Sequence, residues 1–445
     1  MNITELSQKL RDGGVVGAGG AGFPSYAKLN ENADTIILNC AECEPLLRLH
    51  RQLLASHTEE ILTALDTVAE AVGADNIIVA VKPSYKKAVE AVKSALPSHP
   101  KARIGLLPEA YPSGDEVVTI YETTGRVVGA GKLPISVGVI VYNVETMFNA
   151  YHAIKGEGVS SKYITVTGAV KAPVTLKVPL GVTYAEVIKA AGGATVKDFA
   201  LVGGGPMTGP LVNENDVVTK TSNAVIVLPA DHHVVIKKSE APTVSVHRAM
   251  AACCQCHYCT DLCPRHLLGS PIDPARLMRA FASGNTADGE AFLNSNFCCG
   301  CNLCTMFSCF QGLSPSMLIG KVRGELRKNG VRPPEAVMHG VSEQRSGRLI
   351  PVERLVERLG LAEYNVDAPF EDREIEYDKV KIMLSQHIGV PASATVKQGD
   401  AVNKGDVIGT AAEGKLSVTI HSSISGTVTE VTDRYVIVTR RKELD

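Results

Sequence analysis

Two groups of closely spaced cysteines have the residue type and spacing to bind metal. Cys253, Cys256, Cys259 and Cys263 follow the pattern C-x2-C-x2-C-x3-C, and Pro264 follows directly. This pattern is typical of thiolate ligands of 4Fe-4S clusters, and in proteins with two clusters the fourth cysteine binds the other cluster. A second group of cysteines is therefore expected elsewhere in the chain.

The second group lies in residues 298–309. Cys298, Cys301 and Cys304 repeat the two-residue gaps, whereas Cys309 follows after four residues and has no proline behind it. Two clusters that exchange their fourth ligands would lie close enough to pass electrons to each other. One cluster would then be bound by Cys253, Cys256, Cys259 and Cys309, and the other by Cys298, Cys301, Cys304 and Cys263.

A zinc site is the main alternative, because C-x2-C pairs also occur in four-cysteine zinc sites. Three cysteines at two-residue gaps, followed by a fourth cysteine and a proline, favour iron-sulfur clusters. Cys254 and Cys299 each stand beside a predicted ligand, and we expect them to be buried, inert thiols. Cys299 remains an alternative to Cys298 as a ligand.

A glycine-rich loop near the N-terminus has the composition of a phosphate-binding loop. Gly17, Gly19 and Gly22 have G-x-G-x-x-G spacing, although only two valines precede them where a full strand is needed. A flexible turn is the alternative. If a helix begins near Pro24, the loop amides face a phosphate at a positive helix end, and Lys28 adds a charge.

The elements that must position these residues follow from local patterns. Residues 35–144 alternate apolar β-branched runs with helical patterns, which predicts a mostly parallel sheet with helices. Residues 162–230 are rich in strand patterns and contain one short helix, which begins with a capping box formed by Thr183 and Glu186. We therefore expect an α/β domain followed by a smaller strand-rich module.

The second half of the chain predicts three further segments. The two cysteine groups flank a helix that begins after Asp273, which is a good N-cap residue. The charged residues 340–378 predict a solvated helix and a linker. After them, short strand patterns with regularly spaced Gly-Asp turns predict a small all-β barrel or sandwich.

Composition narrows the function and the compartment. The chain has 445 residues, 45 basic and 47 acidic side chains and a formal net charge of -2, which argues against nucleic acid and anionic membranes as partners. The apolar runs are shorter than the roughly 18 residues of a membrane span, and the N-terminus does not resemble a secretory signal. Clustered cysteines indicate metal in a reducing compartment, so we expect the cytoplasm.

The motifs of residues 17–146 together resemble the flavin-binding domain shared by the NADH-oxidising flavoprotein subunit of respiratory complex I and the C subunit of the Rnf complex. The matching segments are GAGGAGFPSYAK, NCAECEP, YPSGDE, TGR and LPISVGVIVYNVET. The resemblance implies FMN and NADH as cofactors, with a binding site formed by Gly17, Gly19, Gly20, Gly22, Phe23, Lys28, Asn39, Glu42, Glu44, Gly114, Asp115, Glu116, Asn143 and Thr146. Ala41 stands where the family has aspartate, which removes one flavin contact.

The remaining modules complete a multidomain α/β architecture. Residues 161–235 resemble a soluble-ligand-binding β-grasp module, and the C-terminal segment resembles a lipoyl-like barrel-sandwich module. The predicted order is an FMN/NADH-binding domain (1–160), the β-grasp module (161–235), a helical double-cluster ferredoxin-type domain (245–335), a linker (336–378) and the barrel-sandwich module (379–445).

This module order resembles the cobalamin reductases of propanediol-utilisation microcompartments. The resemblance implies an NADH-dependent oxidoreductase with FMN and two 4Fe-4S clusters, which reduces cobalamin or a corrinoid-bearing protein and has microcompartment proteins as partners. The protein would then lie in the cytoplasm or inside a bacterial microcompartment. An electron-transfer subunit of an Rnf-like assembly, or a reductase of a flavodoxin or radical activase, is the alternative. We expect no catalytic acid, base or nucleophile, because the cofactors carry the chemistry.

Overall fold

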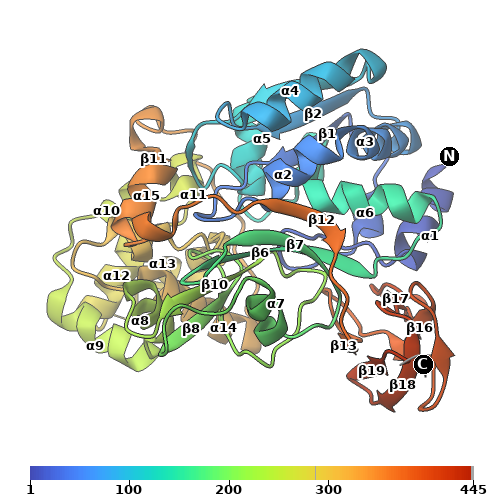
Figure 1. Ribbon diagram of the computed structural model, residues 1–445. Coiled ribbons are helices and arrows are strands. Elements are labelled where there is room, and N and C mark those ends of the chain that lie inside the picture. Colours follow the sequence, from blue (N-terminus) through green and yellow to red (C-terminus); the bar gives the residue numbers. More distant parts are fainter. Residues whose placement is uncertain (286, 442–445) are drawn as a thin grey trace.

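A parallel four-stranded sheet forms the centre of the N-terminal domain in the computed structural model, which describes residues 1–285 and 287–441 (Figure 1). Its order is β3-β2-β1-β5, and all three pairings are parallel. The strands are β1 (Thr35–Cys40), β2 (Asn76–Val81), β3 (Ala102–Leu106) and β5 (Val139–Asn143). The predicted parallel sheet is confirmed, and the carboxyl ends of its strands meet at one edge.

Helices cover both faces of this sheet because its strands are apolar on both faces. Ile36 and Leu38 of β1 belong to a core with the helices of one face, whereas Ile37 belongs to a core with the other face. The first face carries α1 (Ile3–Asp12), α2 (Leu49–Ser56), α3 (Thr58–Val72), α4 (Lys86–Ala95) and α6 (Val144–Ile154), and the second carries α5 (Glu116–Thr124). The short 3-10 turns of this domain are η1 (Ser25–Lys28), η2 (Leu96–Ser98) and η3 (Pro134–Val137).

The glycine loop differs from the prediction. The expected helix near Pro24 is wrong, because residues 25–28 form only the single turn η1. The Gly17 N–H donates to the Phe23 carbonyl at 2.9 Å, and the Ser25 N–H donates to the Val15 carbonyl at 3.1 Å. These two hydrogen bonds close residues 15–25 into a tight loop, and only the single 3-10 turn η1 follows it.

The second sheet has six strands in the order β12-β7-β6-β10-β8-β9. The strands are β6 (Ser161–Gly168), β7 (Val174–Pro179), β8 (Phe199–Gly203), β9 (Leu211–Val212), β10 (Ala224–Pro229) and β12 (Phe370–Glu374). Its helix α7 (Tyr184–Ala190) begins with the predicted capping box of Thr183 and Glu186. This sheet is the strand-rich module expected after the first domain.

The predicted linker packs against two other modules instead of lying free in solvent. Strand β11 (Ile350–Pro351) pairs with β4 (Ala110–Tyr111) of the first domain, and β12 pairs in parallel with β7. Helix α15 (Val352–Arg358) lies between these strands and buries Leu355 and Val356. Figure 1 shows this segment in orange, running between the first domain and the second sheet. The apolar residues of α15 share one face, which explains why a charged segment still packs.

The two cysteine groups lie among short helices. Asp273 accepts a hydrogen bond from the Arg276 N–H and caps the helix that the sequence predicts. The helices are α8 (His233–Ser239), α9 (Pro242–Ala252), α10 (Tyr258–Asp261), α11 (Pro264–Leu267), α12 (Pro274–Ser283), α13 (Gly289–Leu293) and α14 (Pro315–Lys328), with the turns η4 (Asn294–Phe297) and η5 (Cys304–Ser308).

The C-terminal module is a pair of small antiparallel sheets, ordered β13-β19-β18-β15 and β14-β16-β17. The strands are β13 (Lys379–Met383), β14 (Ser393–Ala394), β15 (Ala401–Val402), β16 (Val407–Thr410), β17 (Ile420–His421), β18 (Gly426–Val431) and β19 (Tyr435–Thr439). Its apolar residues form one core with those of the second sheet, so the two modules pack together.

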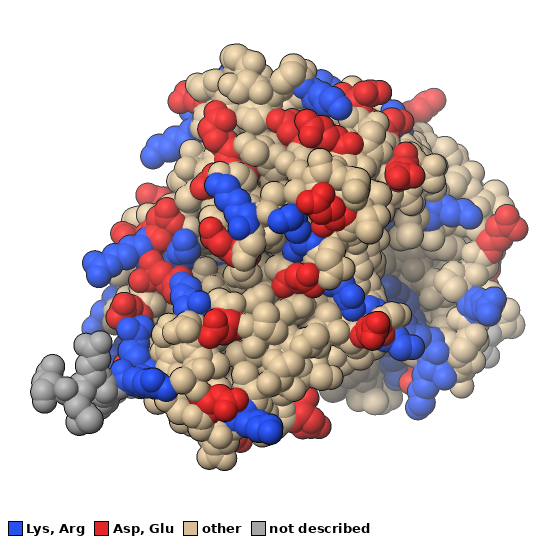
Figure 2. Space-filling model, turned by 90° about the vertical axis from the view of Figure 1, so that its right-hand side faces the viewer, with Lys and Arg blue, Asp and Glu red and all other residues tan. Residues whose placement is uncertain are grey.

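The outer surface carries both signs of charge. Figure 2 shows basic and acidic side chains interspersed over one face of the molecule. Within residues 1–285 and 287–441, no helix is long and apolar enough to span a membrane.

Candidate flavin and iron-sulfur sites

A cavity of about 360 Å³ opens where β1 and β5 end. This is the edge of a parallel sheet at which α/β proteins bind ligands, and its volume is in the usual range for small-molecule sites. Of the predicted flavin-site residues, those that line the cavity are Gly19, Asn39, Glu42, Glu44, Gly114, Asp115, Glu116 and Asn143. Residues from four motifs far apart in the sequence therefore meet in one cavity.

Gly19 is the point where the glycine loop reaches the cavity. A Cβ atom at Gly19 would lie 2.4 Å from the side-chain nitrogen of Asn143, so only glycine fits. The preceding Ala18 N–H donates to Thr146 Oγ1 at 3.0 Å, which ties the loop to α6. Within the described chain, the Gly19 N–H has no protein acceptor. A free amide beside a cavity is the arrangement that a phosphate group requires.

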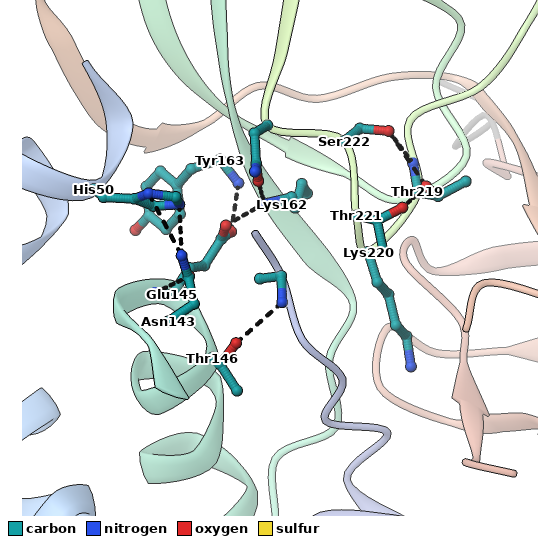
Figure 3. Close-up of polar contacts among 12 residues, drawn as sticks. His50, Asn143, Glu145, Thr146, Lys162, Tyr163, Thr219, Lys220, Thr221 and Ser222 are labelled. Atoms are coloured by element: carbon teal, nitrogen blue, oxygen red, sulfur yellow. Dashed lines mark hydrogen bonds and ion pairs between the residues drawn. The ribbon is translucent and has the colours of Figure 1, made fainter. Parts of the chain in front are cut away.

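His50 and Asn143 form the cavity wall next to Gly19. Figure 3 shows their side chains in contact, with 3.2 Å between Asn143 Nδ2 and His50 Nε2. Burial lowers the pKa of His50, which favours the neutral imidazole. The adjacent Glu145 is buried and accepts hydrogen bonds from Lys162 and the Tyr163 N–H of the second sheet (Figure 3). A buried ion pair thus joins the flavin domain to the β-grasp module behind the cavity.

Glu42 lines the cavity but already has protein partners. Its carboxylate accepts hydrogen bonds from the His50 N–H at 2.7 Å and the Arg51 N–H at 3.3 Å, near the beginning of α2. Its backbone has φ 35°, a conformation that non-glycine residues rarely adopt. This strain at a cavity wall is of the kind found at ligand sites.

Glu44 holds a loop of the β-grasp module against the cavity. Its carboxylate accepts from the N–H groups of Met207 and Thr208, at 2.9 and 3.0 Å, and from the Thr208 hydroxyl. Burial raises the pKa of Glu44. The family resemblance implies that this carboxylate serves a cofactor, whereas in the structure its oxygens are used to hold residues 207–208.

The remaining predicted flavin-site residues do not line the cavity. Lys28 pairs with Glu116 at 3.3 Å and donates to the Val141 carbonyl at 2.9 Å. Gly22 packs against Thr221, and Phe23 is 36 % exposed. The predicted residues outside the cavity lining are Gly17, Gly20, Gly22, Phe23, Lys28 and Thr146. Their assignment to the cofactor stays a prediction.

Four of the predicted cluster ligands surround one small cavity, which we call the first cage. Its lining contains the exchanged ligand set predicted from the spacing, Cys253, Cys256, Cys259 and Cys309, together with Cys254. Burial and the three neighbouring thiols raise the pKa of Cys259 to about 12. Four clustered thiols of this kind would be stabilised as thiolates by binding iron. Cys254 is exposed and not buried as expected.

The other four predicted ligands are Cys263, Cys298, Cys301 and Cys304, which we call the second cage. Their thiols are close enough to influence one another's pKa. Burial, followed by the electrostatic effect of Cys298, Cys259 and Cys263, raises the pKa of Cys304. Cys259 belongs to the first cage, so the two cages are neighbours. Among residues 1–285 and 287–441, no three His, Cys, Asp or Glu side chains are arranged to hold a single metal ion.

The second cage borders the flavin cavity. Cys299 and Cys301 line this cavity, and the Tyr111 hydroxyl of the first domain donates to the Cys301 carbonyl at 2.6 Å. Cys299 is partly exposed, not buried as predicted, because it faces the cavity. The sequence also did not identify the other lining residues, Cys43, Leu47, His50, Tyr111, Pro112, Thr208 and Asn223. Cys43 and His50 lie in or near a recognised motif, whereas Thr208 and Asn223 carried no local signal.

Comparison with known families agrees with this arrangement along the whole chain. Residues 10–152 match the Nuo51 FMN-binding domain, and residues 163–211 match the SLBB domain. Residues 252–314 match a 4Fe-4S dicluster domain, and residues 365–443 match the RnfC barrel sandwich hybrid domain. The predicted multidomain fold and the FMN and iron-sulfur cofactors are confirmed at this level.

Two curated relatives match over nearly their full length. The cobalamin reductase PduS of Citrobacter freundii is 39% identical over 98% of this chain and 96% of its own, and that of Salmonella typhimurium is 37% identical over 99% and 97%. The C subunit of the Na(+)-translocating ferredoxin:NAD(+) oxidoreductase complex of Acetobacterium woodii is 31% identical over 60% of this chain and 59% of its own. The fold and the two sites define an oxidoreductase that transfers electrons between a flavin and iron-sulfur centres. Within this class, the chain belongs to the family of the cobalamin reductases PduS.

Proposed function

We propose that this protein transfers electrons from NADH, through FMN and two 4Fe-4S clusters, to cobalamin. The observation that carries the proposal is the shared wall of the flavin cavity, where the residues of the FMN domain meet Cys299 and Cys301 of the cluster domain. Electron transfer requires the two kinds of centre to be close. A cavity bordered by both provides this proximity.

The residues of the cavity hold and orient the flavin in this proposal. When bound, FMN supplies the conversion of a two-electron hydride donor to one-electron transfer. The free amide of Gly19 serves the phosphate, and the side chains of Asn39 and Asn143 provide polar groups around the rest of the cofactor. Glu44 closes one side of the cavity by holding Thr208 of the β-grasp module in place.

The positions of the two cages support an order of electron transfer. The second cage lies at the flavin cavity, and its Cys304 neighbours Cys259 of the first cage. The first cage contains the exposed Cys256, and Phe310 at its edge is 57 % exposed. Electrons would therefore enter at the second cage and leave to the acceptor from the first.

Cobalamin is proposed as the acceptor because both full-length relatives are cobalamin reductases. The corrinoid can be free or bound to another protein, and the compartment is the cytoplasm or a bacterial microcompartment with its proteins as partners. The relative from the ion-translocating complex favours a second candidate, an electron-transfer subunit of an Rnf-like assembly. A reductase of a flavodoxin or radical activase differs from both only in the acceptor.

The acceptor is tested anaerobically with reconstituted protein, NADH and cob(III)alamin, with the reduction followed optically. We expect reduction by the wild type and by Cys254→Ala, and a loss of at least about tenfold in Cys256→Ala, because the first cage loses a ligand. Fast reduction of a flavodoxin or ferredoxin, with no reduction of cobalamin, would instead support an Rnf-like electron-transfer subunit or a reductase of a flavodoxin or radical activase. Absence of NADH oxidation with any acceptor would exclude the proposed reductant.

A further inference from the structure

Arg265 connects the two cofactor sites through a single side chain. It lies in α11, two residues after Cys263 of the second cage. Its Nη2 is 2.8 Å from Oδ2 of Asp115, and both side chains are largely buried. Asp115 lines the flavin cavity and caps α5 by accepting from the N–H groups of Val117 and Val118, each at 3.2 Å.

The same guanidinium also lies near the second cage. It lies beside the Cys299 side chain, which itself borders the flavin cavity. Within the described chain, the buried Nε of Arg265 has no hydrogen-bond partner. Arg265 therefore has a buried N–H without an acceptor, in addition to the Nη2 group that binds Asp115. A buried guanidinium with an unused donor beside a cluster site requires an explanation beyond a surface ion pair.

We propose that Arg265 is a positioning residue that raises the midpoint potential of the cluster in the second cage, with Asp115 as the opposing charge. A cluster becomes more negative by one charge when it accepts an electron. A nearby positive charge stabilises that reduced form, and a nearby negative charge destabilises it, most strongly where water is excluded. Arg265 and Asp115 thus act on the same centre with opposite sign.

The position of Arg265 and Asp115, between the flavin cavity and the second cage, explains how they would affect electron transfer. A higher midpoint potential of the cluster in the second cage favours the transfer of single electrons from the flavin to that cluster. Under the proposed function, these electrons come from NADH. No proton or bond is involved in this step, so a fixed charge is the simplest means of control. Asp115 also holds the guanidinium in place by a charge-assisted hydrogen bond, which keeps the distance to the cage constant.

The test compares Arg265→Gln, Arg265→Lys and Asp115→Asn by anaerobic redox titration, with the clusters followed by paramagnetic resonance. At the wild-type midpoint potential, we expect Arg265→Gln to lower the ratio of reduced to oxidised second cluster about tenfold, equal to about 59 mV for a one-electron couple. Asp115→Asn should raise this ratio, and it keeps a side-chain oxygen to cap α5. Arg265→Lys keeps the charge and should remain near the wild type.

Arg276→Gln is the control, because Arg276 is an ion-paired arginine of the same domain whose partners are Asp288 and Glu290. It should leave both potentials unchanged.

The inference is overturned if Arg265→Gln leaves the potential unchanged at full iron content, or if Arg265→Lys shifts it as far as Arg265→Gln. If Arg265→Gln loses its cluster, the direction of the Asp115→Asn shift decides: an increase supports the inference and a decrease or no change overturns it. The inference rests on the proposed electron path. The iron content of the wild type is therefore measured first, because a wild type without two clusters would contradict the proposed function itself.

Discussion

Gly19 and Gly20 are neighbours in one loop but differ in what a methyl group would meet. At Gly19 a Cβ atom would overlap the side chain of Asn143, whereas nothing lies within 4 Å of a Cβ atom at Gly20. Neither residue has a positive φ, so backbone strain does not separate them. The difference is purely one of space at the cavity, which makes the pair a matched test of the flavin site.

Gly19→Ala should weaken FMN binding, because the added methyl group displaces Asn143 and fills the phosphate end of the cavity. Overpacking of this kind costs ~1–3 kcal/mol, so the Kd for FMN should rise roughly fivefold to one hundred and fiftyfold. Gly20→Ala should bind FMN like the wild type. Fluorescence titration of the apoprotein measures both, and equal Kd values in the two variants would place the flavin elsewhere.

The number of clusters is decided by the cysteines themselves. Reconstituted wild type should contain about eight irons, from two four-iron clusters. Cys256→Ala should lose about half of the iron, because it removes a ligand of the first cage alone. Cys254→Ala is the matched control, since Cys254 is an exposed neighbour that we do not assign as a ligand. Loss of the same amount of iron in both variants would contradict the ligand assignment.

At the scale of elements, residues 350–374 join modules that are distant in sequence. Strand β11 pairs with the first domain, β12 extends the second sheet, and α15 between them contributes Leu355 and Val356 to a core shared with the cluster domain. That core also contains Leu262 and Leu303, which flank the cysteines. The segment therefore stabilises the arrangement of the flavin cavity and the cages.

Leu355→Ala should destabilise the protein by ~2–5 kcal/mol, because Leu355 is fully buried and its removal leaves a cavity. Glu353→Ala, on the exposed side of the same helix, should change the free energy of unfolding by less than ~0.5 kcal/mol. Chemical denaturation followed by circular dichroism measures both changes. Equal midpoints for Leu355→Ala and the wild type would show that α15 does not contribute to the folded core.

At the scale of the whole molecule, Lys220 lies where three modules meet. It comes from the β-grasp module, and its Nζ donates to the Gly14 carbonyl of the first domain at 2.7 Å and to the Thr419 carbonyl of the C-terminal module at 3.2 Å. Figure 3 shows its side chain directed away from the Glu145–Lys162 pair. Burial lowers the pKa of Lys220 from 10.5 to about 7. Burial, and then Lys220 itself, lowers the pKa of the neighbouring His421 to about 4.

These shifts predict how stability depends on pH. Between about pH 7 and 10.5 Lys220 is neutral in the folded state and protonated in the unfolded state, so its contribution to stability increases with pH by ~1.4 kcal/mol per unit. The contribution is greatest above pH 10.5 and is lost as the pH falls through 7. Lys220→Met should remove this slope, whereas Lys197→Met, at an exposed position of the same module, should retain it.

The measurement is the free energy of unfolding at several pH values from 7 to 10.5 for the wild type and both variants. Other groups titrate in this range, so the difference between each variant and the wild type is the quantity to compare. A parallel pH dependence for Lys220→Met and the wild type would show that Lys220 remains charged in the folded protein.

The sequence alone determined the features that depend on residues close together in the chain. The predicted cluster ligands rest on spacing within short loops. The strands of the parallel sheet, the cap at Asp273 and the capping box at Thr183 are likewise local patterns. Each of these needs only a few neighbouring residues, so the amino-acid order contains the information. The glycine loop shows the limit, because hydrogen bonds at its base, rather than the proline, decided that no helix follows.

Only the tertiary structure decided which of these groups face one another. Glu44 binds Thr208 across 164 positions, and Arg265 binds Asp115 across 150. Likewise, β12 joins the second sheet although its sequence resembles a charged linker. Such contacts depend on how separately folded modules pack, and a carboxylate or a guanidinium has the same local sequence signal whether its partner is a cofactor, a loop or another side chain. The packing of the modules therefore determined the contact partners of these residues, which the spacing of residues in the sequence does not specify.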